Sequence, residues 1–132
     1  MAAVLDTHTA VWYMLSSKDL SASALRAIKD SLQGGEALYL PSISLVEIIY
    51  LTEKGRLPGS ALERVSTALN SPDVGLKLAA LDRSVAESVP RISRGLVPDM
   101  PDRIIAATAL SLGLPLITRD SRIRAAGIQT IW

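Results

Sequence analysis

The sequence alternates short apolar runs with longer segments whose apolar residues recur at helical spacing, and this alternation constrains the fold most. Short runs predict strands at 2–5, 37–40, 75–81, 115–118 and 128–132. Longer segments predict helices at 7–16, 21–35, 42–55, 60–70, 82–92 and 101–113, with a short turn or helix at 120–126. Strands that alternate with helices pair in parallel, with helices on both faces. We therefore expect one three-layer α/β domain over 1–132, with a short parallel sheet of about 4–5 strands flanked by helices.

The composition excludes several classes of protein. Lys and Arg number 14 against 13 Asp and Glu, so no global positive field attracts nucleic acid and any such binding must be local. Cysteine is absent and His8 is the single histidine, which excludes disulfides, thiolate metal sites and histidine-rich zinc sites. The opening MAAVLDTH lacks the basic region of a signal peptide, and no apolar run is long enough to span a bilayer. We expect a cytoplasmic protein that makes no membrane contact.

The aliphatic character of the chain predicts self-association. Hydrophobic residues make up 48% of the sequence although Phe is absent, and the mean hydropathy is +0.29. Such a chain covers part of its apolar surface with a partner or a second copy. We expect a symmetric homodimer to which the helices around Trp12 and within 42–70 contribute, and we interpret Trp12 and Tyr13 as packing or interface residues.

Four carboxylates fall where the predicted strands end or the following helices begin: Asp6, Glu47, Asp102 and Asp120. Asp6 directly follows the first predicted strand, and Asp120 lies just beyond the fourth. Ligands of open α/β sheets bind at the carboxyl ends of the strands, near the point where strand order reverses. Carboxylates that converge there repel one another unless a cation lies between them. Mg²⁺ or Mn²⁺ is the natural choice, because hard cations prefer oxygen ligands.

Most of these acids also have a purely structural interpretation. Asp6 is placed to cap the helix that follows it. Ser44 and Glu47 match a capping box, in which Glu47 bonds the backbone and binds no metal. Asp120 is also a plausible helix cap, and we interpret Asp82 as a cap alone.

Asp102 is the hardest of the acids to explain by helix chemistry. Pro101 suits the first helical position, so Asp102 could simply complement the helix dipole. Apolar residues surround Asp102 on its helix, and Asp99 adds a second negative charge three residues earlier. Two acids at a crowded apolar helix start favour a bound cation.

Arginines flank two of the candidate acids. Arg103 follows Asp102 and Arg119 precedes Asp120, and a guanidinium suits bidentate contact with an RNA phosphate. The alternative is a solvated face that only neutralises the acids, as we expect for Arg122 and Arg124. His8 is interpreted as a solvent-facing residue without a role.

Four motifs in order resemble the PIN-domain family, particularly the bacterial VapC-type toxins: LDTHTAVW, SLVEIIYL, PDRIIAATAL and LITRDSRI. The match runs from the first predicted strand to the last. The resemblance implies a metal-dependent endoribonuclease on a parallel sheet flanked by helices. It assigns catalytic roles to Asp6, Glu47, Asp102 and Asp120, and supporting roles to Asp99, Thr7 and Thr118.

The resemblance also implies partners and a mechanism. Members of this family commonly dimerise and are inhibited by a cognate antitoxin whose C-terminal segment approaches the site. We expect hydrolysis of RNA by metal-activated water, with one cation held by Asp6 and Asp102 and with Asp120 close to it or to a second ion. Glu47 would bind through water or orient the attacking water, and Thr7 and Thr118 would hold carboxylates in place.

Other classes fit the sequence less well. A phospho-accepting receiver domain needs paired acids after the first strand and a late lysine, and no lysine follows Lys77. Phosphatases with a nucleophilic Asp need a second Asp where this chain has His8. No GxxxxGK[ST] is present, which excludes a P-loop NTPase. The alternative that remains is a PIN fold that binds RNA or protein without catalysis.

Overall fold

The computed structural model describes residues 1–132 and shows a parallel sheet covered by helices on both faces. The five strands are β1 (Ala3–Leu5), β2 (Leu38–Pro41), β3 (Leu76–Ala79), β4 (Leu116–Ile117) and β5 (Thr130–Ile131). The seven α-helices are α1 (Thr7–Met14), α2 (Ala22–Gln33), α3 (Ser42–Glu53), α4 (Gly59–Leu69), α5 (Arg83–Ser88), α6 (Met100–Leu112) and α7 (Ser121–Ala125). Each predicted strand and helix is present, which confirms the predicted α/β class.

The strand order is β3-β2-β1-β4-β5, and every neighbouring pair is parallel. The chain builds outward from β1 to β3 on one side and then returns to place β4 and β5 on the other. The order therefore reverses between β1 and β4, which is where ligands of such sheets bind.

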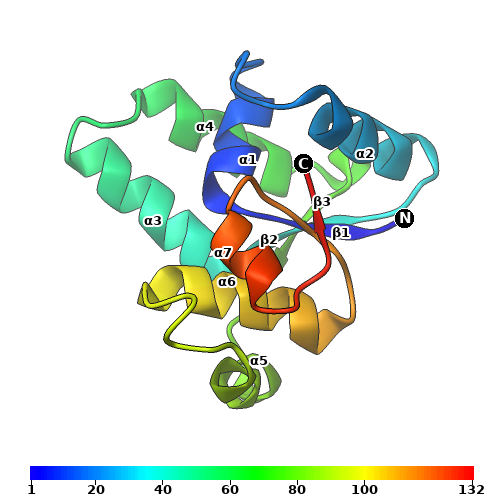
Figure 1. Cartoon of the computed structure of the whole chain (residues 1–132). Coiled ribbons are helices and arrows are strands. Elements are labelled where there is room, and N and C mark those ends of the chain that lie inside the picture. The colour runs from blue at the N-terminus through cyan, green and yellow to red at the C-terminus, as the bar shows by residue number, and fades with distance from the viewer.

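Side chains alternate across the sheet and so form two separate cores. Leu5 of β1 packs with the cluster under α1, α2, α3 and α4, whereas Val4 points into the cluster under α5, α6 and α7. The same alternation separates Ile117 from Leu116 in β4. In Figure 1, α1, α2 and α4 lie on one side of the sheet and α5 and α6 on the other. The three predicted layers are present.

The segment predicted as one helix at 82–92 is divided. Asp82 caps α5 as predicted, since its side chain accepts a hydrogen bond from the Val85 N–H at 2.9 Å. The helix then tightens into a 3₁₀ turn at Val89–Arg91, because Pro90 cannot donate the hydrogen bond that an α-helix needs there.

Helix α3 exposes several large apolar side chains: Val46, Ile49 and Tyr50 are 48%, 37% and 59% accessible to solvent. They lie in the range predicted to take part in dimerisation, and pairing of two chains stays a prediction. No helix is both long enough and apolar enough to cross a membrane.

Candidate active site at the ends of two central strands

Asp6 lies immediately after β1, at the start of α1, and its carboxylate does not cap that helix. It occupies the N-cap position of α1, yet its side chain makes no capping hydrogen bond. Its Oδ2 instead accepts a short hydrogen bond from the Thr118 hydroxyl beyond β4. The capping alternative for Asp6 is therefore wrong, and the bond joins the ends of the two strands between which the order reverses.

Glu47 is likewise oriented by a threonine. Its Oε1 accepts a hydrogen bond of 2.6 Å from the Thr7 hydroxyl at the start of α1. The capping-box alternative is wrong, because β2 runs directly into α3 and the helix begins at Ser42. Ser44 is therefore inside the helix, where its buried hydroxyl has no partner.

Asp102 stands out because its carboxylate accepts no hydrogen bond. The cap of α6 is Asp99, whose side chain accepts from the Asp102 N–H at 3.1 Å. The Asp102 side chain is thus left half-buried without a partner. Burial raises the pKa of Asp102 to about 7, with further contributions from Asp99, Asp6, Glu47 and Asp120, in that order.

The pKa values of Asp6 and Glu47 are raised as well. Burial is the largest cause that raises the pKa of Asp6, and the negative charge of Asp120 adds to it. The pKa of Glu47 is raised first by burial, then by the charges of Asp6 and Asp99. The candidate acids are therefore close enough to repel one another across four separate elements of the fold.

A depression of about 430 Å³ collects three of these acids, Asp6, Asp102 and Asp120. Its other lining residues are His8, Thr9, Trp12 and Arg119. Neither Glu47 nor its partner Thr7 lines it, although Glu47 is close enough for its charge to contribute to the raised pKa of Asp102.

Asp120 serves two purposes in the structure. Its Oδ1 accepts from the Arg122 N–H at 2.9 Å and caps α7, so the capping alternative is confirmed for this residue. The same oxygen lies 3.4 Å from the Arg122 guanidinium. Capping uses only one carboxylate oxygen, and Asp120 still lines the depression.

The two arginines predicted to contact phosphate behave differently. Arg103 points away from the depression, and its guanidinium donates to the Ile92 carbonyl at 2.8 and 3.2 Å and to the Val89 carbonyl at 3.1 Å. Its predicted contact with RNA finds no support, because these bonds fix it to the 3₁₀ turn. Arg119 lines the depression, and its guanidinium lies over the Trp12 ring, 4.8 Å from the ring centroid.

Sequence reasoning missed Thr9 and gave no role to His8. The buried Thr9 hydroxyl donates to the Ile117 carbonyl at 2.8 Å and ties α1 to β4. His8 is exposed as predicted, but it lines the depression, with its ring centroid 5.6 Å from that of Trp12. A second threonine two residues after Thr7, at the start of a helix that is apolar from Ala10 onward, was the pattern that could have indicated Thr9.

The donor set suits a hard divalent cation in its chemistry. Every candidate ligand is a carboxylate, and the pKa values of Asp6 and Asp102 are raised first by burial and then by neighbouring negative charge, both of which a bound cation would offset. No group of three or more acidic or histidine side chains is drawn together closely enough to enclose an ion. The residues therefore fit such a cation by type and charge, without forming a closed cage.

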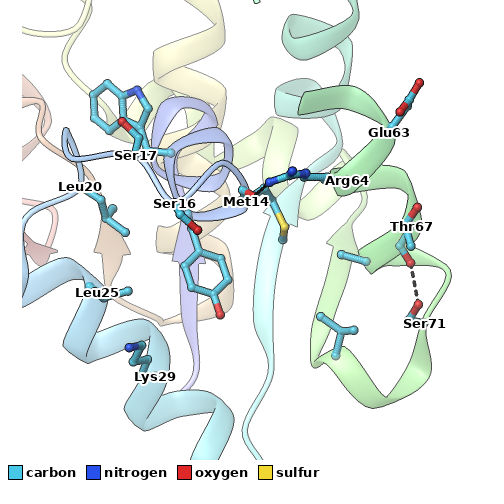
Figure 2. A pocket seen from close by; sticks show the side chains of 14 residues that line it. Met14, Ser16, Ser17, Leu20, Leu25, Lys29, Glu63, Arg64, Thr67 and Ser71 are labelled. Carbon is cyan, nitrogen blue, oxygen red and sulfur yellow. Dashed lines mark hydrogen bonds between the residues drawn. The ribbon is translucent and has the colours of Figure 1, made fainter. Parts of the chain in front are cut away.

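A second and larger hollow of about 800 Å³ lies between α1, α2 and α4. Figure 2 shows Leu25 and Lys29 of α2 across from Arg64 and Thr67 of α4. Half of its lining residues are hydrophobic, and Trp12 lines both this hollow and the acidic depression. The two hollows therefore meet at one side chain.

Known proteins resemble the chain over nearly its whole length. The model of the PIN domain family matches residues 3–129. Ribonuclease VapC22 of Mycobacterium tuberculosis is 29% identical over 122 residues, which cover 92% of this chain and 89% of that protein.

Solved structures share the fold. VapBC2 of Rickettsia felis, bound to a promoter DNA fragment, contains a chain with a TM-score of 0.73 at 15% identity, covering 98% of this chain and 97% of that one. FitAcB of Neisseria gonorrhoeae gives a TM-score of 0.63 at 24% identity, with 97% and 95% covered. With its parallel sheet, its strand-end acids and a family match that spans almost every residue, the chain belongs to the PIN domain family.

Proposed function

We propose that the protein is a metal-dependent endoribonuclease that acts as the toxin of a toxin–antitoxin pair. The observation that supports this most is the depression at the reversal of strand order, where Asp6, Asp102 and Asp120 meet and the Asp102 carboxylate lacks any partner. Similarity to Ribonuclease VapC22 and to chains of VapBC complexes supports RNA as the substrate and an antitoxin as the partner.

In this proposal, some side chains of the site would hold the cation and others would position them. Asp6 and Asp102 would hold Mg²⁺ or Mn²⁺, with Asp120 beside them. Thr118 donates a hydrogen bond to the Asp6 carboxylate and Thr7 donates one to Glu47, and in this proposal Glu47 would orient a water molecule. The cation, when bound, would lower the pKa of a water molecule and screen the negative charge of the phosphodiester.

The chemistry of the cut ends tests the mechanism. Hydrolysis by a water molecule leaves 5′-phosphate and 3′-hydroxyl ends, whereas attack by a ribose 2′-hydroxyl leaves a cyclic phosphate. We expect the protein to cut single-stranded RNA with Mg²⁺ or Mn²⁺, to stop in EDTA, and to yield 5′-phosphate ends by end-labelling and mass spectrometry. Cyclic-phosphate ends would contradict the mechanism, and metal-insensitive RNA binding without cleavage would favour the scaffold alternative.

The larger hollow is the place we propose for the antitoxin. It is a partly apolar groove between three helices, of the kind that accepts an amphipathic segment. Because Trp12 lines both hollows, a segment that fills the groove reaches the acids without leaving the surface. A basic side chain at its end would neutralise the carboxylates that otherwise hold the cation.

A charge placed in the groove tests this arrangement. We expect Leu25→Glu to weaken inhibition by the antitoxin, taken as the co-expressed product of the adjacent reading frame, by about tenfold or more, because it replaces an apolar contact with a carboxylate that must lose water in the interface. Inhibition is measured as residual RNA cleavage relative to each variant without antitoxin. The matched control is Leu112→Glu, at a residue 43% exposed outside the groove. Equal inhibition of both variants would place the antitoxin elsewhere.

A further inference from the structure

Three tilted aromatic rings and a guanidinium form a stack, of which His8, Trp12 and Arg119 border the acidic depression. Trp12 is at its centre, with the Trp132 ring centroid 5.8 Å away at an interplanar angle of 58° and the His8 ring on another side. Arg119 lies over the Trp12 ring at 4.8 Å from the centroid. Such cation–π contact holds a guanidinium in one orientation, and the stack is assembled from α1, the end of β4 and the last residue of the chain.

The guanidinium of Arg119 keeps its hydrogen-bond donors free. It makes no salt bridge and no hydrogen bond, although Asp120 is its neighbour in sequence and Asp6 and Asp102 line the same depression. Asp120 pairs with Arg122 instead. A long cationic side chain beside three acids normally folds onto one of them, so the Trp12 face holds Arg119 away from them.

The free donors lie where a polyanion needs them. Arg119 is the only Lys or Arg that lines the depression, against three carboxylates. RNA that approaches the acids is repelled until a cation offsets their charge, and the net charge of +1 gives no general attraction. A guanidinium presents a planar fork that matches phosphate geometry.

We propose that Arg119, held on the Trp12 ring, binds a phosphate of the RNA next to the one that is cut. This inference rests on the proposed function and deepens it by naming the group that places the substrate. Arg119 touches the substrate, and Trp12 is a positioning residue that acts through Arg119. The contact exists before and during the reaction, so it lowers KM and leaves kcat nearly unchanged.

RNA binding without cleavage tests the contact with phosphate. The full-length protein in EDTA is titrated into a short labelled single-stranded RNA at several salt concentrations. We expect Arg119→Ala to raise Kd by about tenfold and to reduce the slope of log K against log salt by about 0.7, the value for one phosphate contact on a single strand. Arg124→Ala is the matched control, since Arg124 is an exposed arginine of α7 without an ion pair or a place in the depression.

Variants of Trp12 and a lysine at 119 test the stack. Trp12→Phe keeps an aromatic face and should keep KM, whereas Trp12→Leu should raise KM several-fold with kcat little changed. Arg119→Lys should restore the salt slope but only part of the affinity, because an ammonium lacks the planar fork. Thermal melts identify any variant that fails to fold, and for such a variant Arg119→Lys carries the comparison.

Two results would overturn this inference alone. One is an Arg119→Ala variant whose Kd and salt slope equal those of Arg124→Ala. The other is a folded Trp12→Leu variant with the KM of the parent protein. Failure of the nuclease proposal is distinguishable, because it would leave binding that depends on Arg119 intact while no RNA is cut. Absence of RNA binding by the parent protein both in EDTA and with Mg²⁺ present would overturn the two proposals together.

Discussion

Replacing Asp102 with asparagine should abolish RNA cleavage while the domain stays folded. The Asp102 carboxylate accepts no hydrogen bond, so no protein group needs its charge. If it holds the cation, its loss removes several kcal/mol of stabilisation from the reaction, or about a thousandfold in rate. The measurement is the initial rate of RNA cleavage at saturating Mg²⁺, with circular dichroism to confirm the fold.

The matched control is Asp82→Asn. Asp82 caps α5 through the Val85 N–H and lies outside the depression, and asparagine is nearly as good a cap as aspartate. Cleavage by Asp82→Asn should therefore equal that of the parent protein. If Asp102→Asn also retains activity, the carboxylate of Asp102 serves only the helix.

Thermal stability gives the same substitution a second readout. The pKa of Asp102 is raised from 3.8 to about 7 in the folded chain. Between about pH 4 and pH 7 the unfolded chain therefore ionises more readily, and the metal-free folded state loses stability as pH rises. Asp102→Asn has no such charge. Its free energy of unfolding at pH 8 in EDTA should therefore be about 1–2 kcal/mol higher than that of the parent protein, after discounting for solvent screening of a half-buried group.

Added metal should make the parent protein more stable than Asp102→Asn. The parent protein should gain about 2.7 kcal/mol when Mg²⁺ or Mn²⁺ is at a hundredfold excess over its dissociation constant. Asp102→Asn should lose most of that gain. An unchanged metal-induced shift in melting temperature would contradict the assignment of Asp102 as a ligand.

Replacing Thr118 with valine should lower cleavage by about tenfold to a hundredfold, the usual effect of removing a group that orients a metal ligand. The Thr118 hydroxyl donates to Asp6 and accepts from the Asp120 N–H at 3.1 Å, so a single oxygen positions two of the acids. Valine keeps the shape of this buried side chain and removes only the hydroxyl. Cleavage rates at several Mg²⁺ concentrations measure the effect. The variant should also need a higher Mg²⁺ concentration to reach half of its maximal rate.

Thr118→Ser is the control for this substitution. Serine keeps the hydroxyl and loses a methyl group, so the rate should return to near that of the parent protein. Valine and serine variants with equal rates would show that the hydroxyl plays no part in the reaction.

The sequence predicted the fold because each element has a local cause. Short apolar runs bounded by Pro, Gly or Asp can form only short strands here, and the parallel order follows from the helices between them. The positions of Asp6 and Asp120 at the strand ends followed from that order. Glu47 was a candidate from its place early in the helix after the second strand, whereas the family resemblance supplied the proposed role of Thr118.

The errors arose where tertiary contacts decide between equal local patterns. Ser44 and Glu47 match a capping box, but the pattern does not fix the residue at which a helix begins, and β2 leads into α3 without a loop. Arg103 follows Asp102 in sequence, yet its guanidinium turns to carbonyls ten or more residues earlier. The stack of Arg119 on Trp12 joins opposite ends of the chain, and no periodicity relates them.

The central position of β1 determines how the protein matures during synthesis. This strand precedes both of its neighbours in the chain, and it pairs with β2 on one side and with the much later β4 on the other. While translation proceeds from the N-terminus, the edge of β1 that faces β4 stays unpaired. Asp6 has no bond to the Thr118 hydroxyl until that residue, 112 positions later, has been made. A chain released before Thr118 is made therefore lacks the hydrogen bond that fixes Asp6, so the acids come together only after β4 has been synthesised and has paired with β1.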